Sequence, residues 1–568
     1  MAMFNCIHHA LVFMSPPLPR DLVGIVLTPI DDISGNLERK LDLFPVVIIS
    51  LSAMIGSGLF VLPALAMLEM GGGSVPVGGV WLAYLLAAIV VLPGAISKSE
   101  LATAMPSSGG SYVYVQETFG PLIGTISGLG LWANFMLKSA FALIGFKAYL
   151  WVIEDVIGFD INLESAAMLL LLFIVAVNIL GLKRIKKVQI PIVMISTAFL
   201  FGICIWALAT MDMNWDAAFS RDAFGTGIES VATTAAFVFV SYAGVTKIAA
   251  VGGEIKDPSK NIPQGILLSL TFATILYVFV TMVMAMTVDP SMFMEGSHHA
   301  REDPVYIFAT EVGGTDVGLI AAVLSVVTMT SMALAGIMAS SRFPYAMSID
   351  KLVPKVLGEV HSKYHTPHWA IIGTGLSMAA AITFLPVHDV AELASGFKIM
   401  IFIVINGCVI VLRGSASSHW YKPEWKSPMY PFFQVFGIVG GMALLLLMGA
   451  KALIGGAAAV VLGSIIYKTY GDSNTEEEIT PWETYVLMRT NPSEAERRRR
   501  VASFHLADTD GSGKLNLEEF VSAAELLGLE GFDRPSLEEH FHAADVNEND
   551  LMEIEEYASM IEKLTSKD

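Results

Sequence analysis

Charged residues are scarce in this chain. Only 15% of its 568 residues are Asp, Glu, Lys or Arg, whereas 54% are hydrophobic and the mean hydropathy is +0.62. A soluble globular protein of this length would carry more charge and fewer apolar residues. The composition therefore excludes a soluble globular protein and indicates one that crosses a membrane many times.

Cysteine is nearly absent, and positive charge is deficient. Cys6, Cys204 and Cys408 lack the pairing of a disulfide framework and the spacing of a zinc site. The formal net charge is −19, but residues 471–568 hold 24 acidic and 9 basic residues, a net of −15. The rest of the chain carries only −4, so we expect the acidity to belong to a soluble tail. We expect no nucleic-acid partner.

Apolar runs of about 20 residues, the length that a spanning helix needs, recur along the chain. We interpret residues 1–40 as a cytosolic N-terminal segment and residues 41–470 as a membrane domain. The expected spans are residues 44–68, 77–96, 122–150, 165–182, 188–209, 230–251, 265–288, 317–338, 368–385, 391–412, 431–449 and 452–467. The last run is short, so we expect about twelve transmembrane helices in an all-α polytopic membrane protein.

Lysine and arginine residues near span ends predict the orientation, because they are retained on the cytosolic side. If the N-terminus is cytosolic, the loops on that side hold 13 of these residues, and the opposite loops hold only Arg221, Arg301 and Lys451. Both termini are therefore expected in the cytosol. The plasma membrane is favoured over an organelle membrane.

Two of the expected spans are interrupted by small and polar residues at mid-membrane depth. The first span contains Ile55-Gly56-Ser57-Gly58-Leu59, and the sixth contains Phe239-Val240-Ser241-Tyr242-Ala243-Gly244. A lipid-exposed backbone must bond to itself, so a broken helix indicates a cavity or ligand that takes over those bonds. One such break is also typical of close helix packing. Matching breaks in helices 1 and 6 favour a five-plus-five inverted repeat with its binding site at the midplane.

Four motifs, in order along the chain, resemble the signatures of amino acid permeases in the amino acid-polyamine-organocation (APC) superfamily. They are residues 55–60, 100–114 and 253–263, followed by a loop made of 342–354 and 361–367. The likeness extends over about residues 40–470. It implies a secondary transporter for amino acids or related amines, and not an enzyme.

A zwitterionic substrate needs donors for its carboxylate and acceptors for its ammonium group. Amides around Ser57 and Gly58 would lie at the positive end of the outer half-helix and suit a carboxylate, whereas carbonyls freed at the two breaks would face the ammonium. This division of roles also matches what the resemblance implies. The expected substrate-binding residues are Ala53, Met54, Ile55, Gly56, Ser57, Gly58, Leu59, Phe239, Ser241, Tyr242 and Gly244. Phe239 and Tyr242 could close over the substrate, although aromatic residues here are also ordinary packing residues.

Three lysines, Lys138, Lys247 and Lys398, lie deep within apolar runs. A charge at that depth is costly unless it faces water or a partner. Lys247 follows the second break and is the coupling candidate, because a buried amine can release its proton or stand as a fixed cation in place of sodium. The alternative is a snorkelling lysine or a structural ion pair.

Other residues bear on the coupling ion and on partners. Sodium-coupled members of this architecture place hydroxyl ligands in span 8, where Thr328, Thr330 and Ser331 lie. Such hydroxyls are also common at helix contacts, so H⁺ is favoured over Na⁺. Residues 152–164, the expected loop between spans 3 and 4, contain no cysteine. This departs from the heteromeric exchangers of the superfamily, so a disulfide-linked heavy chain is not expected.

The tail contains two calcium-loop patterns of the EF-hand type. In each, oxygen ligands recur at positions 1, 3, 5, 9 and 12, with a backbone carbonyl at position 7. The second loop has Asp550 where the first has a glycine. The expected Ca²⁺ ligands are Asp508, Asp510, Ser512, Lys514, Asn516 and Glu519 in the first loop, and Asp545, Asn547, Asn549, Leu551, Glu553 and Glu556 in the second.

The two loops predict a soluble, all-α, paired EF-hand domain at residues 494–568, after a linker at 471–493. Leu515 and Met552, at position 8 of each loop, are expected to pair. The run Arg497 to Arg500 is interpreted as a solvated helix face or as a contact for anionic lipid or the acidic lobe. The leading hypothesis is a calcium-responsive amino acid permease. The rival hypothesis is a membrane sensor that binds an amino acid and signals through the tail without net transport.

Overall fold

The computed structural model describes residues 41–105, 110–158, 162–181, 185–250, 252, 255–295, 299–415, 421–475, 480–495, 503–504, 507–508, 512–527, 534–544 and 551–565. The expected N-terminal segment and parts of two signature motifs, residues 106–109 and 253–254, lie outside this range. The described residues fall into two compact units, one within residues 30–485 and one within residues 486–568. Each unit is considered by itself.

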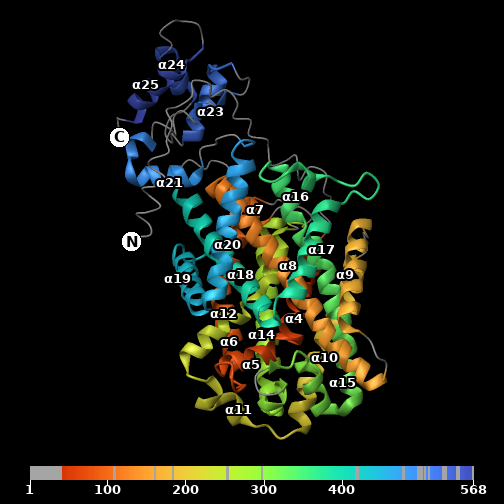
Figure 1. Ribbon diagram of the computed structural model, residues 1–568. Coiled ribbons are helices and arrows are strands. Elements are labelled where there is room, and N and C mark those ends of the chain that lie inside the picture. The colour runs from red at the N-terminus through yellow and green to blue at the C-terminus, as the bar shows by residue number, and fades with distance from the viewer. Residues whose placement is uncertain are drawn as a thin grey trace. The chain divides into compact units, whose positions relative to one another are not determined.

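The first unit is almost entirely helical (Figure 1). Its α-helices are α3 (Leu43–Met54), α4 (Ser57–Phe60), α5 (Leu62–Met70), α6 (Val80–Ala104), α7 (Ser111–Phe119), α8 (Pro121–Ile157), α9 (Leu163–Leu180), α10 (Ile185–Thr210), α11 (Trp215–Phe219), α12 (Ile228–Val238), α13 (Val245–Ala250), α14 (Pro258–Thr287), α15 (Pro304–Ser340), α16 (Arg342–Ile349), α17 (His368–Phe384), α18 (Val387–Gly414), α19 (Phe432–Leu447) and α20 (Ala450–Ile466). A further helix, α21 (Pro481–Thr490), crosses the boundary between the units.

Nine helical stretches among the described residues are long and apolar enough to cross a membrane. They are Val80–Ala104, Pro121–Glu154, Leu163–Leu180, Gln189–Thr210, Ile228–Ala249, Pro258–Thr287, Pro304–Ile349, Val387–Gly414 and Ala450–Gly471. Three shorter apolar helices, α3, α17 and α19, accompany them. The prediction of a mostly helical, multi-pass membrane protein is confirmed.

The first expected break is present. Helix α3 ends at Met54, Ile55 takes an extended conformation with φ −76° and ψ 99°, and α4 begins at Ser57. A second interruption at Val61 separates α4 from α5. Gly56 has an extended φ of 179°, so its φ does not require glycine. It lacks a side chain because a Cβ there would collide with the sulfur of Met332.

The sixth span changes its winding instead of opening fully. Helix α12 passes into a 3₁₀ segment, η2 (Phe239–Gly244), which passes into α13. A 3₁₀ segment inside an α-helix frees carbonyls from their usual partners and often marks a functional hinge. The interruption therefore lies at the expected residues, as a more tightly wound helical segment and not as an open break.

Three details differ from the sequence prediction. Residues 152–157 are helical, because α8 continues until Gly158, whose left-handed φ of 78° ends it. Helix α15 begins at Pro304 and not near Val317, with a kink at Gly314, whose φ is 79°. The unit also contains a small antiparallel pair, β1 (Met294–Glu295) and β2 (His299–Ala300), in the connection between α14 and α15.

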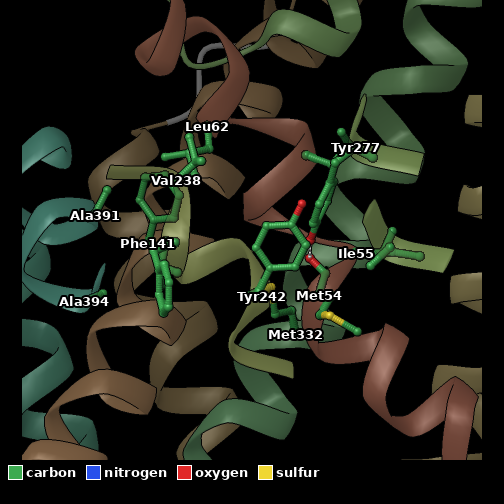
Figure 2. Packing of buried hydrophobic residues seen from close by; sticks show 14 of the residues in the cluster. Met54, Ile55, Leu62, Phe141, Val238, Tyr242, Tyr277, Met332, Ala391 and Ala394 are labelled. Atoms are coloured by element: carbon green, nitrogen blue, oxygen red, sulfur yellow. Dashed lines mark hydrogen bonds between the residues drawn. The ribbon is translucent and has the colours of Figure 1, made fainter. Parts of the chain in front are cut away.

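The broken segment lies among the long helices. Helix α8 packs against α15 and α18, and α14 packs against α6 and α3. The residues from Ala53 to Leu62 are all buried, and Figure 2 shows Met54 and Ile55 beside Tyr242, Tyr277 and Met332. The break is thus enclosed by protein, as an irregular backbone at membrane depth requires.

The second unit is built from short helices around one apolar cluster. Its helices include α23 (Leu517–Leu527), α24 (Arg534–Ala544) and α25 (Ile554–Thr565). Phe504, Phe520, Phe541 and Tyr557 contact one another in the cluster. Leu515 and Met552 form an antiparallel bridge with N···O distances of 2.9 and 2.8 Å. The predicted pairing of these two residues is confirmed.

Candidate functional site

The two broken segments meet. The hydroxyl of Ser241 in η2 lies 3.4 Å from the carbonyl oxygen of Gly58 in α4. A Cβ at Gly58 would lie 2.9 Å from that hydroxyl, and a Cβ at Gly244 would collide with the carbonyl oxygen of Ser50 in α3. Glycine at these two positions is therefore explained by close backbone contact between the first and sixth spans.

Amide donors cluster at the start of α4. The amides of Leu59 and Phe60 donate to the carbonyl of Gly56, each over 2.9 Å. The amides of Ser57 and Gly58 open the helix and have no acceptor within it. Backbone donors at a helix start favour an anionic group.

Tyrosine hydroxyls bind the carbonyls that the first break exposes. The Tyr277 hydroxyl lies 2.8 Å from the carbonyl oxygen of Met54 (Figure 2). It also lies 3.1 Å from the carbonyl oxygen of Ser241, so it bridges the two breaks. The Tyr84 hydroxyl donates to Gly58 over 2.9 Å, and the Tyr149 hydroxyl donates to Phe60. The expected ammonium acceptors Met54 and Ser241 are therefore held by a tyrosine in this conformation.

Side chains of other helices bind the carbonyls of the sixth span. The Lys138 ammonium of α8 donates to the carbonyl of Val240 over 3.0 Å, and the Lys398 ammonium of α18 lies 3.5 Å from the carbonyl oxygen of Ala243. The Ser395 hydroxyl donates to Phe237 and accepts the amide of Val240. The 3₁₀ segment thus obtains from α8 and α18 the bonds that a regular helix would supply.

A small cavity of about 10 Å³ lies beside the break. Its lining comes from five elements and consists of Ala53, Phe135, Lys138, Ser139, Ala243, Lys247, Met332 and Gly336. This volume holds about one water molecule, so an amino acid needs neighbouring side chains to move. Met332 is the flexible one, with its sulfur against Gly56 and 3.8 Å from the Ser57 hydroxyl.

The expected site residues do not all face this cavity. Ala53 and Lys247 line it, whereas Leu59 is fully buried in the core. Phe239 packs edge-on against Phe402 with the ring centroids 5.8 Å apart. The Tyr242 hydroxyl donates to the carbonyl of Tyr84 over 2.9 Å. In this conformation, Phe239 and Tyr242 therefore act as packing and anchoring residues.

Two of the hydroxyls expected at a sodium site, those of Thr328 and Thr330, donate to carbonyls one turn earlier in α15. The Thr328 hydroxyl donates to Leu324 and lies 2.7 Å from the hydroxyl of Ser196. The Thr330 hydroxyl donates to Val326, one turn earlier in α15. The Ser331 carbonyl accepts a hydrogen bond from the side-chain amide of Gln189 in α10. These contacts are typical of helix packing in a membrane.

One group of histidine and acidic residues lies close enough for a metal among the described residues, at His388, Asp389 and Glu392. His388 Nε2 lies 3.0 Å from the carboxylate of Glu69 in α5, and Asp389 is paired with Lys451 over 2.6 Å. These contacts join α5 to α18 through a hydrogen bond and α18 to α20 through an ion pair.

The described part of the first calcium-loop pattern is folded around its first ligand. The Asp508 carboxylate accepts the amides of Ser512 over 2.9 Å and of Gly513 over 2.8 Å. Gly513 has φ 74°, so the sharp turn at position 6 requires glycine. Glu519 is 6% exposed, and its carboxylate accepts the amide of Asn516. The side chains at positions 1, 5, 9 and 12 carry oxygen atoms, the ligand type that calcium prefers.

The second calcium-loop pattern is described only in part. Asp510 of the first loop and Asp545, Asn547 and Asn549 of the second lie outside the described residues. Of the remaining expected ligands, Leu551 was expected through its backbone carbonyl. The Glu553 carboxylate pairs with Lys514 over 3.0 Å. Glu556 Oε2 accepts the amide of Glu553.

Sequence reasoning missed the residues that hold the breaks in place, namely Tyr84, Tyr277, Ser395 and Met332. A signal existed for the tyrosines, since a hydroxyl inside an apolar span must find a partner in the protein. No sequence signal identifies Met332, because a methionine in an apolar span is ordinary.

Comparisons with known proteins found a family, individual relatives and a solved structure that this chain resembles. The sequence model of the family described as amino acid permease matches residues 45–466. The "Branched-chain amino acid permease BcaP" of Bacillus subtilis is 27% identical over 459 residues, covering 78% of this chain and 95% of that protein. The "Methylthioribose transporter" of the same organism is 26% identical over 458 residues, covering 77% and 94%. The crystal structure of MhsT in complex with L-phenylalanine has a TM-score of 0.50 at 14% identity and covers 75% of this chain and 99% of that one.

Proposed function

Because the chain belongs to the amino acid permease family, we propose that it carries an amino acid or a related amine across a membrane by alternating access. The observation that carries this proposal is the meeting of the two broken spans, where Ser241 contacts Gly58 and Tyr277 bridges Met54 and Ser241. Helix breaks that meet at the middle of a bundle are where secondary transporters bind substrate.

The proposed architecture has twelve spans, with both termini in the cytosol and a five-plus-five inverted repeat. Among the described residues, the nine long apolar helices and the three shorter ones support this number if α3 to α5 form one broken span. The basic residues of the loops support the orientation.

In the proposed site, the substrate carboxylate binds the amides of Ser57 and Gly58. The substrate ammonium takes the carbonyls of Met54 and Ser241, which the Tyr277 hydroxyl releases as Met332 moves away. These groups provide a helix start for the anion and free carbonyls for the cation. H⁺ is the proposed coupling ion, with Lys247 as the coupling residue because it lines the cavity one turn after η2.

The experiment is uptake of a panel of radiolabelled amino acids by proteoliposomes that contain the purified chain, with and without a proton gradient. Accumulation of at least one amino acid above protein-free vesicles is expected, as is stimulation by the gradient. Saturable binding without accumulation would instead support the sensor. The sensor is kept as a second candidate because the chain carries a folded tail with a calcium-loop pattern.

For the tail, we propose that residues 494–568 form a paired EF-hand domain that binds Ca²⁺ and regulates transport. The Leu515–Met552 bridge and the turn at Gly513 support this proposal. Sensor EF-hands open on binding and expose apolar surface. Calcium would change transport only through its different affinity for the inward- and outward-facing states.

A further inference from the structure

Four buried or half-buried lysines of the first unit have no acidic partner among the described residues. Lys98 and Lys398 are 0% exposed and Lys138 is 5% exposed, and Lys247 lines the cavity. None of the four forms an ion pair with a described carboxylate. By contrast, the one carboxylate of α6, Glu100, is bound by Arg413 of α18 at 2.6 Å.

The charged groups close enough to interact with these lysines include other basic side chains, among them Arg342 beside Lys247. Lys138 lies near Lys247, and Lys398 lies near both Lys98 and Lys138. The Lys398 ammonium also faces the ring of Phe402, at 4.7 Å from its centroid. Carbonyl oxygens and aromatic faces lower the cost of a buried cation, but they do not neutralise it.

Two of the lysines share the small cavity. Lys138 reaches it from α8, and Lys247 reaches it from α13. The cavity adjoins the first break through Ala53 and Met332. A substrate whose α-carboxylate binds the amides of Ser57 and Gly58 can therefore extend its side chain toward both ammonium groups as Met332 moves.

The charge of the substrate decides whether these cations are neutralised. A zwitterion adds no net charge to the site. An amino acid with a second carboxylate adds one negative charge, and charge-assisted hydrogen bonds from lysine to carboxylate are stronger than neutral ones. Leaving a buried charge unpaired is costly.

We propose that the substrate is a dicarboxylic amino acid, whose side-chain carboxylate binds between Lys138 and Lys247. This inference rests on the proposed transport function and adds the substrate class. Lys398 would hold the η2 segment through the carbonyl of Ala243, so that Lys138 and Lys247 keep their places at the cavity.

The test compares charged substrates with neutral ones of the same shape. Proteoliposomes would be supplied with radiolabelled L-glutamate, L-aspartate, L-glutamine, L-asparagine and L-leucine, in chloride buffer and in gluconate buffer. At least one acidic amino acid is expected to be taken up about tenfold or more faster than its amide, since hydrogen bonds to charged groups discriminate at that level. The preference is expected to be the same in both buffers.

Matched variants locate the effect. Lys138→Met and Lys247→Met are each expected to reduce the ratio of acid to amide uptake about tenfold. Lys147→Met is the control, since Lys147 is a half-buried lysine of the same helix α8 that does not line the cavity. It should leave the ratio unchanged. If a lysine variant fails to fold, the Lys138→Arg protein, which keeps the charge, is used in its place. The measurement is then the rise in its melting temperature when glutamate is added.

Three other outcomes of these uptake measurements would contradict the inference or the transport function. Uptake of neutral amino acids at least as fast as acidic ones overturns this inference and leaves the transport function standing. Neutral uptake that depends on chloride and loses that dependence in Lys138→Met also overturns it, because the lysines would then hold a free anion. The absence of uptake of any amino acid contradicts the proposed function itself.

Discussion

At the residue scale, the candidate site depends on glycines, which lack side chains, as much as on the side chains around them. Gly56, Gly58 and Gly244 leave room for Met332, Ser241 and Ser50, respectively. Around them, the hydroxyls of Tyr84 and Tyr277 bind carbonyls that would otherwise be unsatisfied. An unsatisfied buried carbonyl costs about 1–3 kcal/mol, so these hydroxyls stabilise the breaks.

Replacement of the break glycines tests this account. Gly56→Leu and Gly58→Leu are each expected to lower uptake about tenfold or more, since overpacking costs about 1–3 kcal/mol and the added side chain meets Met332 or Ser241. Gly202→Leu is the matched control, because Gly202 lies exposed in α10 with open space around it. Uptake per folded molecule would be measured after size-exclusion chromatography. Normal uptake by both break variants would contradict the site assignment.

At the element scale, α6 and α18 are joined by an ion pair whose carboxylate is buried. Arg413 binds the fully buried Glu100 through two hydrogen bonds of 2.7 and 2.6 Å. The hydroxyl of Tyr421 and the amide of Ser427 also donate to the Glu100 carboxylate. This cluster holds the C-terminal end of α18. Nearer the other end of the same helix, Ser395 and Lys398 contact the sixth span. The position of the site thus depends on where α18 is anchored.

Breaking this pair is expected to destabilise the whole membrane unit. Arg413→Met leaves a buried carboxylate without its cation, at a cost of about 3 kcal/mol. The melting temperature in detergent should fall clearly, and the double variant Glu100→Gln/Arg413→Met should recover part of the loss. Lys256→Met is the control, because Lys256 and its partner Asp42 are 47% and 67% exposed, and such a pair contributes about 0–1 kcal/mol. Equal melting temperatures for Arg413→Met and Lys256→Met would disprove the anchoring role.

At the scale of the whole molecule, a membrane carrier and a small helical unit share one chain. The family match ends at residue 466, before the tail begins. The net charge of −15 over residues 471–568 also sets the tail apart from the nearly neutral remainder. The proposed regulation by calcium would therefore depend on the part of the chain that lies beyond the family match.

Calcium dependence is the prediction at this scale. The full chain is expected to bind Ca²⁺ with a dissociation constant of about 10⁻⁷ to 10⁻⁵ M, the range of sensor EF-hands, and its uptake should change over the same range. Glu519→Gln should weaken binding, because position 12 supplies the bidentate ligand. Glu518→Gln is the control, since Glu518 pairs with Arg534 on the surface.

Calorimetry on the full chain and uptake at buffered free calcium would measure the two effects. If Glu519→Gln and Glu518→Gln bind calcium equally well, the assigned loop is wrong. Binding with uptake that ignores calcium would limit the tail to a buffer or a docking domain.

The sequence by itself determined the class of protein, its mostly helical and multi-pass character, and the location of both breaks. Apolar runs and small residues at mid-membrane depth are local properties, and the backbone in lipid has few alternatives to a helix. The family followed from motifs of the same local kind. The helical continuation to Ile157 and the kink at Gly314 were missed, because the ends of helices depend on single residues whose conformation the pattern does not reveal.

Only the tertiary structure decided which groups surround the breaks. Tyr84, Tyr277, Ser395 and Met332 come from four different helices, and no periodicity relates them to Gly56 or Ser241. The same holds for Lys138 and Lys247, which are 109 positions apart in the sequence and line one cavity. Side chains from distant segments meet only after the helices pack, because packing brings together surfaces that the linear order keeps apart.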